Sequence, residues 1–248
     1  MNMPRGILIL LLLAMATSSS GMEKERECVV LLHGVGLSGW VMRPLERALT
    51  KAGYRVINLS YPSRSMPLEQ IAGGFLPAEL ERHGALAAPR LHFVTHSMGS
   101  IVTRLYLRDR RPGNLGRVVM LGPPNHGSPA ADRAGGSRSA RAVMGVNMPR
   151  LGTGPDGVVR TLGPADYEVG IIAGTRLINP LFRGVMPRPH DGVVTVESAK
   201  LEGMRDFRAV PYSHTGMLWR RAVIDDVVAF LQAGRFQSPP TDKLSPNR

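Results

Sequence analysis

Cysteine, lysine and long hydrophobic runs are all scarce in this sequence. Cys28 is the only cysteine among the 248 residues, so no disulfide can form within the chain even in an oxidising compartment. Lysine occurs only at Lys24, Lys51, Lys200 and Lys243, so arginine carries most of the net charge of +12.

The basic residues are scattered along the chain rather than clustered. The sequence has no zinc-ligand spacing, no aromatic RNA-binding signature and no sustained basic run, so we expect no nucleic-acid partner. One interpretation of the charge is an arginine-rich, solvated surface. The functional alternative is peripheral contact with an anionic membrane, because such an excess of cations is attracted to anionic lipid.

Residues 7–16 form an apolar run shorter than the ~20 residues that an ordinary membrane-spanning helix needs. Arg5 precedes the run and Ala14-Met15-Ala16 ends it, a pattern typical of a secretory signal peptide. We predict that residues 1–16 are a signal peptide, cleaved at approximately this point, and that the mature protein is periplasmic or secreted. Membrane anchoring by an uncleaved N-terminus is the alternative.

Residues 27–235 are predicted to form one globular domain. The chain is 43% hydrophobic and 20% charged, as in ordinary globular proteins, and it contains no internal repeat. Short apolar runs alternate with segments of helical periodicity, which indicates parallel crossover units. The expected fold class is α/β, with a mostly parallel doubly wound sheet and helices on both faces. Residues 236–248 are polar and contain proline, so we expect a disordered tail.

The alternation also places the individual elements. Buried strands are expected at 29–32, 54–59, 91–94, 117–121, 169–173 and 208–211. Helices are expected after residue 97 and at about 42–52, 67–83 and 217–231. From about 130 to 166 the periodicity fails, and residues 140–148 are the only segment there of helical character. This excursion is interpreted as a small lid over the sheet edge or, alternatively, as a mobile surface loop.

Ser97 lies where an expected strand ends and an expected helix begins. In the pattern Gly-x-Ser-x-Gly, a sharp turn exposes the serine oxygen above the sheet, and the new helix presents its positive end to developing negative charge. This chain has Thr95-His96-Ser97-Met98-Gly99, so Thr95 replaces the first glycine. We predict that Ser97 is a nucleophile. The alternative is an ordinary serine in a strand–helix turn.

A serine hydroxyl is a weak nucleophile and needs a base, which an acid in turn orients. When the chain order is serine, acid, histidine, each group follows a different strand. His214 is the only histidine after the candidate acid Asp191, and we assign it as the base. Asp191 opens an Asp-Gly turn after the strand at 169–173. It is therefore preferred over Asp156, Asp166, Glu168, Glu197, Glu202 and Asp206.

Attack on an ester carbonyl places negative charge on oxygen, so two N–H donors must already point there. The backbone N–H of Met98 follows the nucleophile and is one candidate. The N–H of Val35 is the other, because Gly34 and Gly36 let the backbone turn inward after the first strand. We expect core, loop or surface roles for His33, His83, His92, His96 and His126, which precede the acid or flank the nucleophile.

Five motifs together resemble the α/β-hydrolase family, in particular its small bacterial lipase and esterase branch. They are His33-Gly34-Val35-Gly36, Thr95-His96-Ser97-Met98-Gly99, Pro124-Asn125-His126-Gly127-Ser128, Asp191-Gly192-Val193-Val194 and Ser213-His214-Thr215-Gly216. The resemblance covers roughly residues 28–231. It implies ester hydrolysis through an acyl-enzyme on Ser97, with Asp191 and His214 completing the triad and Val35 and Met98 forming the oxyanion hole. Thr95 departs from the family pattern, and so does Ser100, which stands where many relatives have glycine.

The sequence therefore predicts a serine esterase or lipase that acts on small-molecule or lipid acyl esters without a metal or organic cofactor. A thioesterase, amidase or acyltransferase using the same triad is the enzymatic alternative. A non-catalytic protein that keeps a hydrolase fold to bind lipid or a partner is the alternative from another class.

Overall fold

The computed structural model describes residues 26–135, 145–155, 157–177 and 186–237. The predicted signal peptide at 1–16 and nearly all of the predicted tail at 236–248 lie outside these residues, and both stay predictions. In the described part, six strands form one sheet in the order β2-β1-β3-β4-β5-β6, with every neighbouring pair parallel. The strands are β1 (Cys28–Leu32), β2 (Arg55–Leu59), β3 (Leu91–His96), β4 (Leu115–Leu121), β5 (Val169–Gly174) and β6 (Asp206–Val210).

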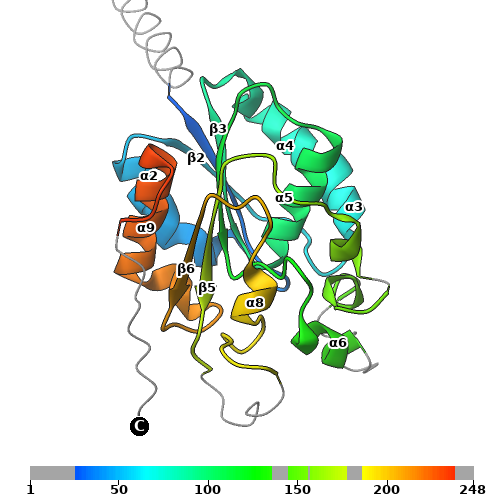
Figure 1. Ribbon diagram of the computed structural model, residues 1–248. Coiled ribbons are helices and arrows are strands. Elements are labelled where there is room, and N and C mark those ends of the chain that lie inside the picture. The colour runs from blue at the N-terminus through cyan, green and yellow to red at the C-terminus, as the bar shows by residue number, and fades with distance from the viewer. Residues whose placement is uncertain (1–25, 136–144, 156, 178–185, 238–248) are drawn as a thin grey trace, which may run out of the picture.

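Helices cover both faces of this sheet (Figure 1). One face carries α2 (Arg43–Lys51) and α9 (Arg221–Ala233), and the other carries α3 (Leu68–Gln70), α4 (Leu76–Arg82) and α5 (Met98–Asp109). The apolar side chains of β1 divide between the two cores by the period-two alternation of a strand: Val29 and Leu31 pack toward α2 and α9, while Val30 and Leu32 pack toward α5. The predicted α/β class, with a doubly wound parallel sheet, is confirmed.

The helix predicted at 67–83 is present, but a π-helical turn over Ile71–Phe75 separates α3 from α4. Pro77 lies in the first turn of α4 and has no N–H to bond the carbonyl of Gly73. In the π turn, the N–H of Leu76 instead donates to the carbonyl of Ile71, five residues earlier. The wider turn lets the chain pass the proline without ending the helix.

The closing helix begins later than predicted. Gly216–Trp219 form a separate 3-10 turn, and Arg220 is extended with ψ of 124°, so α9 starts at Arg221 instead of Met217. A tertiary contact accompanies the break, because the indole N–H of Trp219 donates to the Val41 carbonyl at 3.2 Å. The periodicity of the apolar residues continues through this turn, so it could not reveal the interruption.

The excursion at 130–166 also differs from its prediction. Residues 136–144 lie outside the described part, but α6 (Pro129–Gly135) shows that 140–148 was not the only helical candidate. Proline suits the first helical position, and the Ser128 hydroxyl accepts a hydrogen bond from the Ala131 N–H at 3.2 Å.

The described remainder of the excursion packs onto the core. Four of its apolar side chains are no more than 5% exposed, namely Met148, Leu151, Val158 and Val159. The remaining short elements are α8 (Val196–Ala199) and 3-10 turns at Gly39–Met42, Ala85–Ala87, Pro149–Leu151 and Val158–Thr161. None of the helices in the described part is both long and apolar enough to cross a membrane.

Candidate active site

The segments that follow the strands' carboxyl ends enclose a cavity of about 190 Å³. Ser97 and His214 both line it, and the candidate oxyanion donor Val35 lies on its wall. The lining residues are Gly34, Val35, Leu37, His96, Ser97, Pro124, Ser128, Ala131, Met148, Leu151, Val193, His214 and Thr215. Most of these side chains are apolar, so a hydrocarbon chain in the cavity would contact apolar groups beside the candidate nucleophile.

Ser97 has the backbone of a strained elbow. Its φ of 54° and ψ of −122° make it the only non-glycine residue with positive φ among those described. Its N–H donates to the Leu121 carbonyl at 2.9 Å, which anchors the turn to β4, and α5 starts at the next residue. A Cβ on Gly99 would lie 2.5 Å from the Leu32 carbonyl oxygen, so α5 approaches β1 more closely than any side chain permits.

Two residues depart from the usual elbow pattern, and they contact each other. Thr95 Oγ1 lies 2.8 Å from Ser100 Oγ, and both side chains are fully buried. Thr95 also donates to the Val119 carbonyl at 3.3 Å. The two hydroxyls therefore form a hydrogen bond at positions where small residues usually let the strand and the helix approach. The turn at Ser97 keeps its geometry.

Asp191 and His214 form a buried pair. His214 Nδ1 lies 2.7 Å from Asp191 Oδ2, and Asp191 Oδ1 accepts hydrogen bonds from the N–H groups of Val193 and Val194 at 2.9 and 2.8 Å. A carboxylate can only accept, so in the neutral imidazole Nδ1 carries the proton and Nε2 has the free lone pair. This is the tautomer that a general base requires.

Gly122 is a residue of this site that the sequence prediction missed. It follows β4 with φ of +56°, and a Cβ there would lie 3.0 Å from His214 Nδ1 and 3.2 Å from Asp191 Oδ2. A side chain at this position would press directly on the pair. The signal available in the sequence was a glycine at the carboxyl end of an apolar strand, but such glycines are common in loops.

The loop after β1 is held against the nucleophile. A Cβ on Gly34 would lie 3.1 Å from Ser97 Cβ, which places the loop backbone directly beside the serine. The Tyr61 hydroxyl donates to the His33 carbonyl, and the two rings stack with centroids 4.2 Å apart. Val35 follows in this loop and Met98 opens α5, where the first N–H groups lack intrahelical acceptors.

His96 packs against the candidate base. Its Nε2 donates to the His214 carbonyl at 3.1 Å, and the two rings are 4.7 Å apart. Burial is the main cause that holds the pKa of His96 well below its usual value of 6.5, with the neighbouring His214 adding to the effect. His96 is therefore a neutral donor that positions the main chain of His214, in keeping with a structural role.

The Pro124-Asn125-His126-Gly127-Ser128 motif connects three parts of the site. Asn125 Nδ2 donates to the Ala199 carbonyl at 2.8 Å, and Ser128 Oγ donates to the Val193 carbonyl at 2.7 Å. Val193 stands two residues after Asp191, so the motif supports the loop that carries the acid. His126 is exposed, in keeping with a loop role.

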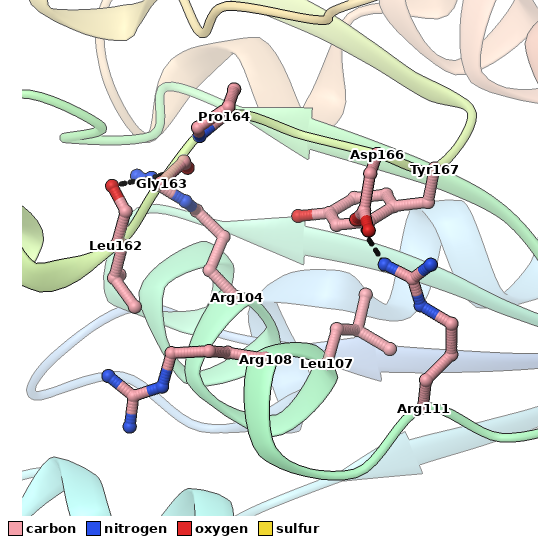
Figure 2. Close-up of a pocket in the computed structure, with 9 residues that line it drawn as sticks. All are labelled: Arg104, Leu107, Arg108, Arg111, Leu162, Gly163, Pro164, Asp166 and Tyr167. Atoms are coloured by element: carbon pink, nitrogen blue, oxygen red, sulfur yellow. Dashed lines mark hydrogen bonds and ion pairs between the residues drawn. The ribbon is translucent and has the colours of Figure 1, made fainter.

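Arg104 was not singled out from the sequence, yet it anchors this motif. Its side chain is buried and donates to the carbonyls of Asn125, Leu162 and Gly163 at 2.9 to 3.1 Å. Figure 2 shows it beside a separate cavity of about 450 Å³, where Arg111 pairs with Asp166. The three candidate catalytic side chains do not line this larger cavity. Arg104 therefore ties two loops to α5 without contacting the candidate nucleophile.

A model of the alpha/beta hydrolase family matches residues 29–243. The chain belongs to the alpha/beta hydrolase family. A search of curated proteins gave no match. The family resemblance predicted from the five motifs is thereby confirmed, and family membership supports a hydrolase function.

Solved structures of lipases share this alpha/beta hydrolase fold. The mature lipase BlEst2 of Bacillus licheniformis is 20% identical with a TM-score of 0.66, covering 85% of this chain and 93% of that one. Phospholipase PlaB of Legionella pneumophila is 18% identical with a TM-score of 0.68, covering 85% of this chain, which spans only 60% of PlaB. Lipase B of Aspergillus fumigatus is 14% identical with a TM-score of 0.62, covering 86% of this chain and 54% of that one. At these identities the likeness concerns the fold.

The structure places Ser97, His214 and Val35 on the wall of one cavity, with Asp191 in contact with His214 and Met98 next to Ser97 in the chain. Their catalytic roles stay predictions. Within the described residues, no cluster of three or more histidine, cysteine, aspartate or glutamate side chains has the arrangement to hold a metal ion.

Proposed function

We propose that this hydrolase cleaves carboxylic acyl esters through an acyl-enzyme intermediate on Ser97. The observation that carries the proposal is the 2.7 Å contact between Asp191 and His214, made beside a strained serine in an apolar cavity. Nε2 of His214 takes the proton of Ser97 as Oγ attacks the ester carbonyl. Asp191 keeps the imidazole in the required tautomer and stabilises the imidazolium that forms.

The next steps release the alcohol and then the acid. The carbonyl oxygen becomes negatively charged in the tetrahedral intermediate, and the backbone N–H groups of Val35 and Met98 stabilise it. His214 returns its proton to the departing alkoxide, so an alcohol leaves and the acyl group stays on Ser97. Water then attacks the acyl carbonyl with His214 again as base, which frees the carboxylic acid and restores the serine.

The cavity lining supports an acyl ester as the substrate class. Leu37, Met148, Leu151 and Val193 supply apolar walls to the side of Ser97. Burial of a hydrocarbon chain against such walls is favourable by roughly 25 cal/mol for each Å² removed from water. Two of these walls, Met148 and Leu151, come from the excursion predicted as a lid, so this segment shapes the cavity.

An active-site-directed phosphonate tests the nucleophile. We expect a fluorophosphonate to label the folded protein stoichiometrically, with the adduct located on Ser97 by peptide mass spectrometry. Ser97→Ala should remove all labelling, whereas the matched change Ser65→Ala, at an exposed turn serine, should leave it intact. Labelling that persists in Ser97→Ala, or its absence from the folded wild-type protein, would overturn the proposal.

We further propose that residues 1–16 export the protein and that its cationic surface contacts anionic lipid. The charge pattern of the N-terminal segment and the net charge of +12 support this. Expression in a bacterium with the native N-terminus, followed by fractionation and intact mass measurement, tests the export. We expect a periplasmic or extracellular product that lacks about the first 16 residues. A full-length cytoplasmic product would contradict it.

A further inference from the structure

The only two tryptophans of the chain lie side by side on its surface. Trp40 is 60% exposed and Trp219 is 50% exposed, and their rings meet edge to face with centroids 6.0 Å apart. They are two of the four large hydrophobic side chains exposed in the described part, and the other two are Leu86 and Val146. Residues far apart in the sequence therefore place the largest apolar side chains together in contact with water.

Neighbouring residues fix these rings in place. In the 3-10 turn Gly39–Met42, the residues Val41 and Met42 are buried while Trp40 points out. The second turn repeats this arrangement, with Met217 and Leu218 buried and Trp219 exposed. The Trp219 indole N–H donates to the Val41 carbonyl, so the two turns are joined. The packing orients both indoles outward instead of into the core.

The pair stands next to the candidate active site. Leu37 and Thr215 line the cavity that contains Ser97. The turn that carries Trp40 starts two residues after Leu37, and the turn that carries Trp219 starts directly after Thr215. A ligand or membrane that contacts the two tryptophans would therefore lie close to the wall of the cavity.

The residues that flank each tryptophan in the sequence carry positive charge. Within four residues on either side of each tryptophan, the sequence contains Arg43, Arg220 and Arg221 and no acidic residue. All three arginines are exposed, and the Arg221 side chain remains 91% exposed although it contacts Asp225 at 3.3 Å. Tryptophan favours the boundary between hydrocarbon and water, because its ring is apolar and its N–H is polar. Arginine beside it is attracted to lipid phosphates.

We propose that Trp40 and Trp219, with Arg43, Arg220 and Arg221, form a docking surface for an anionic phospholipid bilayer. The indoles enter the headgroup region and the guanidinium groups contact phosphates. The surface deepens the proposed function and rests on it, because docking presents lipid esters to the cavity. The binding step itself requires no hydrolysis, so the two proposals can fail separately.

Tryptophan fluorescence tests the surface directly, because all the tryptophan emission comes from these two residues. The full chain carrying Ser97→Ala is mixed with vesicles of phosphatidylcholine and phosphatidylglycerol in equal parts. We expect the emission to shift to shorter wavelength and to be quenched by lipids with brominated acyl chains. The apolar segment at 7–16 could itself attach the chain to vesicles, but it contains no tryptophan. Unchanged emission with these vesicles would overturn the proposal.

Charge variants test the role of the arginines. Arg220→Gln combined with Arg221→Gln should weaken partitioning into the anionic vesicles by roughly 10- to 30-fold, since each cation near such a surface contributes about a factor of five. The matched pair Arg82→Gln and Arg90→Gln removes equal charge from exposed positions elsewhere and should have a smaller effect. Equal effects of the two pairs would show attraction by net charge alone and would contradict a defined surface.

Two further measurements separate the remaining outcomes. An emission shift that grows with protein concentration and needs no lipid would indicate a second copy of the chain on this surface, and would overturn the membrane proposal. Hydrolysis of a soluble ester in the absence of vesicles tests the catalytic proposal independently. Docking without hydrolysis would support the docking surface and would contradict the esterase proposal.

Discussion

Thr95 Oγ1 lies 2.8 Å from Ser100 Oγ, which joins the end of β3 to the first turn of α5 across the candidate nucleophile. These are the two positions at which the chain departs from the glycine-rich elbow of its relatives. A Ser100 hydroxyl buried there alone would lack this partner, whereas in the pair Ser100 contacts Thr95 and Thr95 donates to the Val119 carbonyl. The departure therefore preserves the turn at Ser97.

This contact predicts coupled stability effects. Thr95→Ala should lower the free energy of unfolding by about 1–3 kcal/mol, because it leaves the Ser100 hydroxyl buried without its partner. Ser100→Ala should have a smaller effect, since Thr95 keeps the Val119 carbonyl as acceptor. Urea unfolding should show the double variant to be at least about 0.5 kcal/mol more stable than the sum of the single changes implies. Strict additivity would show that the two hydroxyls do not interact.

Asp191→Asn should abolish the base while preserving the loop. The Asn oxygen can still accept from the N–H groups of Val193 and Val194, which directs its NH₂ group toward His214 Nδ1. Nδ1 must then act as acceptor, so Nε2 carries the proton and cannot remove one from Ser97. We expect the turnover number to fall by about 10⁴-fold with little change in circular dichroism. A soluble variant with full esterase activity would place the acid elsewhere.

Gly122→Ala separates backbone strain from pressure on the catalytic pair. Gly84 has a similar φ of +60° but no atom within 4 Å of an added Cβ, so Gly84→Ala is a matched control. Both changes should lower stability by roughly 1–2 kcal/mol, because alanine disfavours positive φ. Only Gly122→Ala should also reduce turnover, since its methyl group would meet His214 Nδ1. Equal turnover in the two variants would show that Gly122 does not shape the site.

His96 predicts acid sensitivity of the fold. Burial depresses the pKa of His96 in the folded protein, so below about pH 6.5 the unfolded chain binds a proton that the folded chain does not. Its contribution to stability is therefore full well above that pH and is lost as the pH falls, with a slope that approaches about 1.4 kcal/mol per pH unit. His33 has a pKa lowered by burial and acts in the same direction.

Urea unfolding at a series of pH values measures this slope. In His96→Gln the amide can still donate to the His214 carbonyl, but the titrating group is gone. The slope between about pH 6 and pH 5 should fall by about 1.2 kcal/mol per pH unit relative to the parent protein. An unchanged slope would mean that His96 is not the neutral, buried group described.

The sequence predicted those features that depend on neighbouring residues or on the order of residues along the chain. Continuous apolar runs such as Val29–Leu32 require burial on both faces, which is why the parallel sheet could be predicted. The order of Ser97, Asp191 and His214 along the chain gave the candidate triad, because parallel strands bring their carboxyl ends to one edge.

Tertiary contacts explain what the sequence did not reveal. The closeness of Gly122 to the Asp191–His214 pair depends on where β4 ends relative to loops that come much later in the chain. The late start of α9 accompanies a contact between Trp219 and Val41, which lie far apart in the sequence. Arg104 is one of many arginines in this chain, so the sequence did not distinguish it from the solvated ones. Its burial and its hydrogen bonds to three carbonyls appear only in the structure.

The most direct test of a serine esterase mechanism is the hydrolysis of p-nitrophenyl esters, from acetyl to palmitoyl. The wild-type protein is compared with folded Ser97→Ala, His214→Ala and the double variant. Because the triad acts as a unit, each single variant should lose nearly all turnover and the double variant little more. Ser65→Ala should retain the wild-type rate. Ester hydrolysis that survives in folded Ser97→Ala, or its absence from the wild-type protein at every chain length, would contradict a serine esterase.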